Sequence, residues 1–237
     1  MGIGKEITEL QDKIGYKFAD LKFLETAVTH SSYSNEQKSR GHAFLAKERL
    51  EFLGDAVLQI VISKFLYENY KEQAEGSLTK MRQILVCEKT LSKIAAEINL
   101  GDYINLGRGE EMTACRNRPK ILADTLEAVF GAVFIDSNSD ENKYGPVILN
   151  LLLSEIENAY KSQKGDYKTL LQQLVEKDGT ATLCNEVVEE NGPEHDKEFT
   201  VVAKVNNNIV GKGISKSKKG AEMKAAKVAL SLFGVKL

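Results

Sequence analysis

The chain has 237 residues, of which 42% are hydrophobic and 28% are charged, and its formal net charge at pH 7 is −2. This is an ordinary globular composition with enough apolar residues to bury a core, and the length allows one domain or two. The nearly balanced charge argues against a generally basic nucleic-acid coat, although an average over the chain can hide local patches.

Signals for export, membrane insertion and disulfides are missing from the sequence. The first residues contain no apolar segment of the signal-peptide kind, and the longest apolar stretches are too short to span a bilayer. Three cysteines, Cys87, Cys115 and Cys184, are odd in number and far apart, so they support neither a disulfide framework nor a zinc site. We therefore expect a cytoplasmic protein with no membrane segment.

The spacing of apolar residues changes along the chain. Up to about Tyr160 it has the 3.6-residue period of helices, and alternating patterns typical of strands follow Asp166. The segment between them, residues 161–166, is short and polar, which is typical of a linker. We predict an all-α domain over residues 1–160, a linker over 161–166, and an α-β-β-β-α domain over 167–237.

In the second domain the predicted elements are a helix at 169–176, strands near 183–189, 198–205 and 209–214, and a helix from about Lys218. Apolar residues along the last helix, at 221, 225, 228, 229 and 232, predict a stripe that covers the sheet. The glycine pairs at 107–109 and 211–213 lack the further residues of nucleotide-binding loops, and we interpret both as turns. No nucleotide cofactor is expected.

A first group of acids lies on one predicted helix. Glu48, Glu51 and Asp55 are spaced i, i+3 and i+7, so their carboxylates share one helical face. The apolar residues Leu50, Leu53, Val57 and Ile60 are expected on the opposite side of this helix. Crowded carboxylates usually need a cation, but a solvated surface face would explain this group equally well.

A second predicted helix, residues 121–134, is apolar almost all round except for Asp124 and Glu127. Such a helix should be buried, and buried carboxylates are costly unless they are paired or bind a metal. The i, i+3 spacing lets both acids face one point, where a hard ion such as Mg²⁺ is the natural partner. Pairing with a core Arg or Lys is the alternative.

Both acidic segments resemble motifs of the ribonuclease III family. The first is E-R-L-E-F-L-G-D at residues 48–55 and the second is I-L-A-D-T-L-E-A at 121–128. Further similar segments are T-H-S-S-Y at 29–33, E-G-S-L-T-K-M-R at 75–82 and N-L-G-R-G-E-E at 105–111. The chain departs from the common family pattern at Ser31 and Ala56, and neither change removes a carboxylate.

This resemblance implies a set of site residues and a chemistry. Glu51, Asp55, Asp124 and Glu127 would form the metal-binding catalytic set, with Glu48 and Glu75 lining the same cleft. The implied cofactor is Mg²⁺, with Mn²⁺ as a substitute, and water activated by the metal would leave 5′-phosphate and 3′-hydroxyl ends. The family resemblance also implies a homodimer with Phe52 packed across its interface, and simple core packing of Phe52 is the alternative.

Lysines gather near the end of the chain. Residues 166–237 hold 11 Lys and 10 acidic residues, and six of these lysines lie between Lys212 and Lys227, where Glu222 is the single acid. Lys218 and Lys219 fall at the expected start of the last helix, where cations oppose the helix dipole unless an anion joins them. A solvated lysine face is the alternative.

The α-β-β-β-α order, with G-P-E-H at 192–195 and K-S-K-K-G-A-E at 216–222, resembles a double-stranded-RNA-binding domain. The resemblance implies that the first helix and the loop before the second strand contact RNA minor grooves, and that the start of the last helix holds the phosphates between them. Thr169, Gln172, Gln173 and His195 would make the first contacts, and Ser217, Lys218 and Lys219 the second. Gln173 stands where many relatives carry Glu.

The leading hypothesis is a Mg²⁺-dependent endoribonuclease that cuts double-stranded RNA. The resemblance suggests ribosomal RNA precursors, messenger RNA and other structured RNAs as targets. A non-catalytic double-stranded-RNA-binding protein remains the alternative, but such a protein would be free to lose acids that this chain retains. A small-molecule metallohydrolase would leave the RNA-binding module unexplained.

Overall fold

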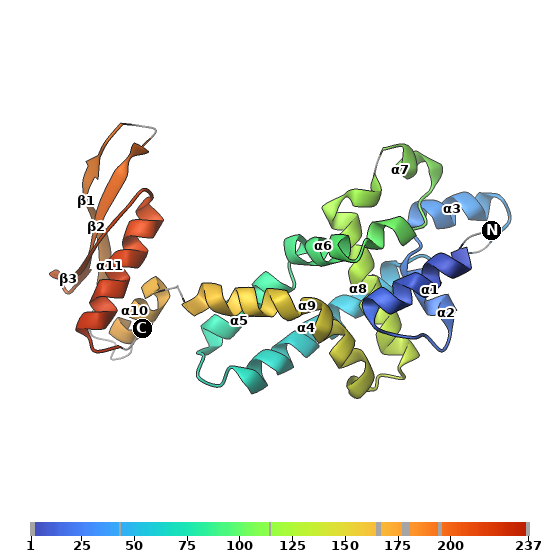
Figure 1. Cartoon of the computed structure of the whole chain (residues 1–237), viewed down its shortest axis with the longest axis horizontal. Helices are drawn as coiled ribbons and strands as arrows, with labels where there is room; N and C mark the ends of the chain where they lie inside the picture. The colour runs from blue at the N-terminus through green and yellow to red at the C-terminus, as the bar shows by residue number, and fades with distance from the viewer. Residues whose placement is uncertain are drawn as a thin grey trace. The chain divides into compact units, whose positions relative to one another are not determined.

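The structure is a computed structural model that describes residues 3–42, 44–113, 115–164, 167–176, 181–193 and 196–235. By its internal contacts the chain divides into two compact units, Met1–Ala159 and Tyr160–Leu237. The first is helical and the second holds a three-stranded sheet with its helices, which confirms the predicted fold class (Figure 1).

The first unit is built from helices and short 3-10 turns. Its elements are α1 (Ile3–Ile14), α2 (Leu21–Ala27), α3 (Ser31–Ser39), α4 (Glu48–Asn69), α5 (Glu75–Leu85), α6 (Glu88–Glu97), η1 (Leu100–Tyr103), α7 (Arg108–Met112), η2 (Cys115–Asn117), α8 (Pro119–Asp136) and α9 (Glu141–Lys164). Pro119 opens α8 at its first position, where a missing N–H costs nothing. As predicted, α8 is buried along most of its length.

Helices α4 and α8 approach each other closely because each has a glycine at the contact. A Cβ atom on Gly54 would lie 1.8 Å from the backbone oxygen of Glu127, and one on Gly131 would lie 2.2 Å from the backbone oxygen of Leu50. No larger residue fits at either position without moving the helices apart. The two glycines therefore bring the acidic turns of α4 and α8 together.

The buried face of α4 differs from the one that the sequence predicts. Leu50 and Val57 are buried, but Leu53 is half-buried and the side chain of Ile60 is 60% exposed. The contact with α8 is centred on Gly54, so the buried face includes Leu58, Val61 and Ile62 instead. Because of this rotation, Glu51 and Asp55 flank the buried face rather than lying opposite to it, and Glu51 reaches the acids of α8.

Helix α9 begins at Glu141 and ends at Lys164. Residues 161–164 of the expected linker are therefore helical, and residues 165–166 lie outside the described residues. The division found by contact clustering falls at Ala159 and Tyr160. The domain boundaries drawn from the sequence stay a prediction.

The second unit has the predicted α-β-β-β-α order. Its elements are α10 (Tyr167–Glu176), β1 (Leu183–Asn191), β2 (Glu198–Val205), β3 (Asn208–Ser215) and α11 (Lys218–Leu232). The strands form an antiparallel sheet in the order β1-β2-β3, and β2 and β3 are joined by a tight turn in which Asn206 and Asn207 have positive φ. Asparagine tolerates this left-handed conformation better than most residues.

Helix α11 packs closely on the sheet because small residues line both sides of the contact. Gly211 and Gly213 lie within strand β3, so the turn expected at 211–213 is wrong. A Cβ atom on Gly211 or Gly213 would lie 2.1 or 2.2 Å from a backbone oxygen of α11, so only glycine lets the helix pack this closely. Ala221, Ala225 and Ala229 are buried as predicted, but Val228 and Leu232 are 51% and 69% exposed. The narrow alanine ridge fits against glycine, and this close fit leaves the bulkier residues outside.

Among the described residues, no helix is both long enough and apolar enough to cross a membrane. Cys87, Cys115 and Cys184 are free thiols. Cys115 is buried, and its thiol donates a hydrogen bond to Glu110 at 2.6 Å.

Candidate functional site

Three carboxylates from two helices meet at the α4–α8 contact. Oxygen atoms of Glu51, on α4, and of Asp124 and Glu127, on α8, all lie within 4.8 Å of one another. Each of the three side chains is half-buried. The acids of the two predicted helices are thus brought together in space, at a spacing that one metal ion could bridge.

The electrostatic strain in this cluster is concentrated on Glu127. Burial raises the pKa of the Glu127 carboxyl from 4.5 to about 7, and the negative charges of Asp55, Asp124 and Glu51 add to the increase. The positive charge of Lys47 acts in the opposite direction but does not cancel the shift. Below about pH 7 the cluster therefore keeps a proton on Glu127, which a divalent cation would displace.

Asp55 contributes charge to the cluster without belonging to its closest group. Its carboxylate oxygen Oδ1 accepts a hydrogen bond from Gln59 at 2.9 Å, within the same helix. Its effect on the pKa of Glu127 shows that it lies within electrostatic range of that side chain. Direct metal binding by Asp55 stays a prediction.

Among the described residues, the two further acids expected in the cleft do not belong to the three-acid group. Glu48 is exposed and borders an apolar hollow next to Phe52. Glu75 accepts a hydrogen bond from Thr79 at 2.7 Å and lines a different hollow with Tyr67 and Tyr70. Neither contributes to the three-acid group, so their place in the same cleft stays a prediction.

A buried lysine, which the sequence analysis missed, joins the cluster. The ammonium of Lys47 lies 2.5 Å from Oε2 of Glu51 and 3.9 Å from Oδ2 of Asp124, and the residue is 2% exposed. This is the core lysine of the alternative interpretation, but one positive charge faces four carboxylates. A lysine four residues before Glu51, on the same side of the helix, was the signal that could have revealed it.

The donor set fits a hard divalent cation. All of its ligand atoms are carboxylate oxygens, which Mg²⁺ and Mn²⁺ prefer, and the group includes no thiol or imidazole. Like charges held this close are unfavourable unless a cation neutralises them. The raised pKa of Glu127 follows first from its burial and then from these neighbouring negative charges.

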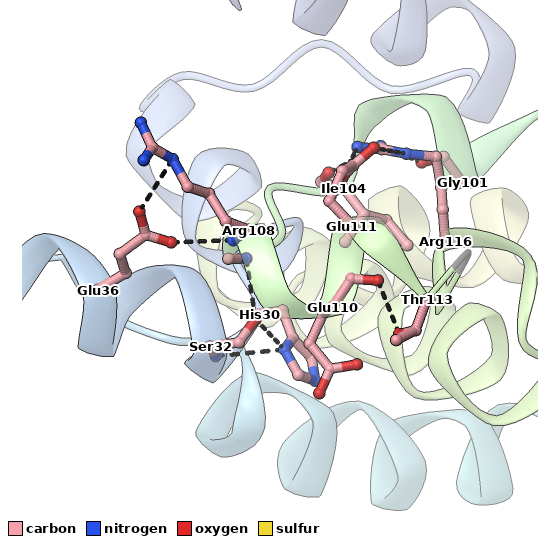
Figure 2. A network of polar contacts seen from close by, with 11 residues as sticks. His30, Ser32, Glu36, Gly101, Ile104, Arg108, Glu110, Glu111, Thr113 and Arg116 are labelled. Atoms are coloured by element: carbon pink, nitrogen blue, oxygen red, sulfur yellow. Dashed lines mark hydrogen bonds and ion pairs between the residues drawn. The ribbon is translucent and has the colours of Figure 1, made fainter.

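A polar network joins helix α3 to the start of α7. His30 caps helix α3, its Nδ1 accepting from the backbone N–H of Ser32 at 3.2 Å, and Ser32 accepts from Gly107 N–H at 2.9 Å. Figure 2 shows the guanidinium of Arg108 turned toward Glu36, whose carboxylate also accepts from the Arg108 N–H at 2.9 Å. His30 is a structural residue here, because its ring caps helix α3.

An apolar hollow adjoins the acidic helix on its outer face. It is lined mainly by apolar side chains of α2, α4 and α8, among them Phe23, Leu50, Leu53 and Ile135. The ring of Phe52 borders it and is 81% exposed. Core packing within one chain therefore does not explain Phe52.

In the second unit, the predicted phosphate-binding residues open helix α11. Ser217 caps this helix by accepting a hydrogen bond from the Gly220 N–H at 3.1 Å. Lys218 is 2.7 Å from a carboxylate oxygen of Glu190 and lies over the ring of Phe199. Lys219 is exposed beside it.

Part of the predicted minor-groove surface can be placed. Thr169 and Gln172 lie on α10, and Gln172 donates to Glu176 at 2.9 Å. The side chain of Gln173 and the whole of His195 lie outside the described residues. The RNA contacts of these residues stay predictions.

Family comparisons cover both units. Residues 20–156 match the model of a ribonuclease-III-like domain, and residues 167–232 match that of the double-stranded RNA binding motif. Ribonuclease 3 of Natranaerobius thermophilus is 46% identical over 225 residues, which span 95% of each chain. Ribonuclease 3 of Clostridium tetani is 42% identical over 226 residues, or 95% of this chain and 94% of that protein.

Solved structures give the same result for the first unit. Two structures of the nuclease domain of ribonuclease III from Campylobacter jejuni align with TM-scores of 0.57 and 0.55 at 36% and 37% sequence identity. They cover 64% and 62% of this chain, and 96% and 95% of the solved chains. One of them is described as flexible in a region involved in dimer formation.

Proposed function

Because the chain belongs to the ribonuclease III family, we propose that it is an endoribonuclease that cuts double-stranded RNA with the help of a divalent cation, Mg²⁺ or Mn²⁺. The observation that carries the proposal is the meeting of Glu51, Asp124 and Glu127 within 4.8 Å, with the Glu127 pKa raised to about 7. The motif match over residues 167–232 supports duplex RNA as the substrate.

Each part of the acidic cluster has a distinct task in this proposal. Glu51, Asp124 and Glu127 would hold the cation, and Asp55 would add negative charge beside them. When bound, the cation lowers the pKa of a nearby water and stabilises the charge that develops on the phosphodiester. Glu127 must lose its proton before it can act as a ligand, so its raised pKa makes cation binding stronger at alkaline pH.

The products would carry 5′-phosphate and 3′-hydroxyl ends, because water attacks phosphorus and the 3′-oxygen leaves. The protein supplies no covalent nucleophile in this scheme. Its residues bind the cation, and the second unit binds the duplex through shape and phosphate contacts rather than sequence.

The alternative function is duplex binding without cleavage. It predicts a protein in which the acids only pair with Lys47, as the buried Lys47–Glu51 contact of 2.5 Å would allow. The geometry favours the nuclease, because the single ammonium of Lys47 contacts Glu51 and Asp124 and leaves a group of three carboxylates only partly neutralised.

The test is incubation of the full chain with end-labelled double-stranded and single-stranded RNA of one sequence, with Mg²⁺ or with chelator. We expect cation-dependent cutting of the duplex alone. The new 5′ ends should accept a label from polynucleotide kinase only after phosphatase treatment, which identifies them as 5′-phosphates. Duplex binding without cutting would establish the non-catalytic alternative.

We also propose that the protein works as a homodimer through the apolar face around Phe52. An exposed aromatic ring beside an apolar hollow can insert into the same hollow of a second copy, which is the self-complementary arrangement of a two-fold interface. Sedimentation equilibrium should give a dimer for the wild type and a monomer for Phe52→Asp. If Phe52→Asp still forms a dimer, the face around Phe52 is not the dimer interface.

Domain limits and location complete the proposal. Limited proteolysis should cut first within residues 161–166 if domains 1–160 and 167–237 are independent bodies. We likewise propose that ribosomal RNA precursors are targets, which crosslinking of RNA to the protein in cells tests. A cytoplasmic location is also proposed, and cell fractionation tests it.

A further inference from the structure

Lys47 occupies an unusual position for a lysine. It is 2% exposed, directly precedes the first residue of α4, and its ammonium lies between a carboxylate of α4 and one of α8. A buried ammonium is costly unless negative charge meets it, and lysines are rarely buried this completely. Here the partners, Glu51 and Asp124, are two of the three acids proposed to hold the divalent cation.

The main chain on both sides of Lys47 is held firmly. Its N–H donates to the backbone oxygen of Thr29 at 2.9 Å, and its carbonyl accepts from the Glu51 N–H at 2.9 Å. Thr29 is itself buried and donates through its hydroxyl to the oxygen of Glu25 at 2.6 Å. The ammonium is therefore directed into the cluster by the fold.

Lys64, a lysine within helix α4, provides a contrast. Lys64 lies 2.5 Å from Glu141, the same distance as in the Lys47–Glu51 pair, but its side chain is 47% exposed. Water can replace Glu141 as a partner of Lys64, whereas the 3% exposed side chain of Lys47 has little access to water. Breaking the buried Lys47 pair should therefore cost more stability than breaking the exposed Lys64 pair, although the two pairs have the same length.

We propose that Lys47 is a built-in counter-ion of the acidic cluster, which stabilises the cation-free protein and weakens the binding of divalent cations, and so sets the cation concentration that the enzyme needs. The inference rests on the proposed function, because it takes Glu51, Asp124 and Glu127 as the cation-binding group. It adds a positioning and tuning residue to that group.

Two effects of Lys47 oppose each other, and their balance decides the direction. Its positive charge repels a divalent cation in the same cluster. The ammonium also partly neutralises Glu51 and Asp124, which would otherwise attract the cation more strongly. Its hydrogen bond also orients Glu51, which would favour binding. The charge should dominate, because the close packing of α4 on α8 at Gly54 already fixes both acidic turns.

The experiment measures Mn²⁺ binding to the full chain without RNA, by isothermal titration calorimetry, for variants that separate charge from orientation. Lys47→Met removes charge and hydrogen bond, Lys47→Gln removes the charge but keeps a donor, and Lys47→Arg keeps the charge. Lys64→Gln, within helix α4, is the matched control. Thermal melting in chelator and in Mn²⁺ is recorded for every variant.

Both neutral variants should bind Mn²⁺ about tenfold more tightly than the wild type, since an ammonium a few ångströms away has been removed. Lys47→Arg keeps the positive charge and should bind Mn²⁺ about as weakly as the wild type does. Lys64→Gln should also bind as the wild type does. In chelator the neutral variants should melt at lower temperature, and Mn²⁺ should restore more stability to them than to the wild type.

Unchanged or weaker Mn²⁺ binding by Lys47→Gln would overturn the inference, and Lys47→Gln decides the matter alone if Lys47→Met does not fold. A wild type that binds Mn²⁺ and cuts duplex RNA, with neutral variants of equal affinity, would overturn this inference and leave the proposed function standing. A wild type that binds no Mn²⁺ would overturn both.

Discussion

Charged residues are used in opposite ways in the two units. In the first unit Glu51, Asp124 and Glu127 are half-buried at a helix crossing, and burial and like charges raise the pKa of Glu127 to about 7. In the second unit Lys218 lies at the surface, where its hydrogen bond to Glu190 lowers the pKa of that exposed carboxyl. Fixed, crowded charge suits a metal ion, and exposed, exchangeable charge suits a phosphate backbone.

The difference lies in how each region exchanges partners. The acids of the first unit cannot move apart, because Gly54 and Gly131 hold the two helices together. The lysines of the second unit already have surface partners, such as Glu190 for Lys218 and Asp196 for Lys216, which an RNA phosphate can replace at small cost. Changes in the first region should therefore have large effects, and changes in the second should have graded ones.

The largest effect is expected for Glu127→Gln, which keeps the shape of the side chain and removes the charge. Cleavage of duplex RNA should fall by about 1,000-fold, because charge stabilisation at the phosphodiester depends on the cation that Glu127 holds. Duplex binding in chelator, measured by gel shift, should stay as in the wild type. Glu97→Gln, at an exposed surface pair with Lys93, is the control, and normal cutting by Glu127→Gln would contradict the site.

Gly54→Ala tests the scaffold rather than the charges. Its Cβ would collide with the Glu127 backbone oxygen, so the free energy of unfolding should fall by at least about 3 kcal/mol. Urea unfolding followed by circular dichroism measures this change. Gly76→Ala, on helix α5, has nothing within 4 Å of the new Cβ and should leave the stability within about 1 kcal/mol of the wild type.

The raised pKa of Glu127 predicts how stability depends on pH in the absence of a cation. The folded protein holds a proton up to about pH 7 that the unfolded chain releases near pH 4.5, so the free energy of unfolding falls as pH rises through this range. After discounting for the partial solvent exposure of this side chain, the loss should be about 1–2 kcal/mol.

Urea unfolding in chelator at several pH values measures this loss. Glu127→Gln should lack this component, so its stability should fall less than that of the wild type between pH 4.5 and 7. Equal pH profiles for the two proteins would show that Glu127 ionises normally.

The double variant Lys218→Ala with Lys219→Ala should have a smaller, graded effect. Duplex affinity should fall by about tenfold at moderate salt, and the slope of log affinity against log salt should become shallower by about 2. Gel-shift titrations at several salt concentrations measure both. Lys93→Ala, an exposed and paired lysine of the first unit, is the control, and an unchanged salt slope would remove these lysines from the RNA surface.

Glu190→Gln should give the smallest change, in the opposite direction. Without its carboxylate, Lys218 loses a competing partner, and duplex affinity should rise by about two- to threefold. Glu186→Gln is the matched control, because it removes the same charge from the same strand but frees Lys204 instead. Equal gains in the two variants would indicate a general charge effect rather than release of Lys218.

Much of the architecture could be predicted from local patterns. The period of apolar residues predicted both units and the α-β-β-β-α order of the second. Ile60 and Val228 were wrongly placed because periodicity identifies a face only to within a residue or two. In both cases a close contact at glycine, Gly54 on α4 and Gly211 on β3, rotates the packed face.

The sequence by itself determined the helical and α-β-β-β-α units, the acids at Glu51, Asp124 and Glu127 and the lysines at 218 and 219, because periodicity, charge and motifs are local properties. Tertiary structure decided that the three acids meet within 4.8 Å, that Asp55 lies outside this closest group, and that Lys47 is buried beside it. The reason is physical: distances between helices depend on which backbones can touch, and that is settled by packing at two glycines far apart in the chain.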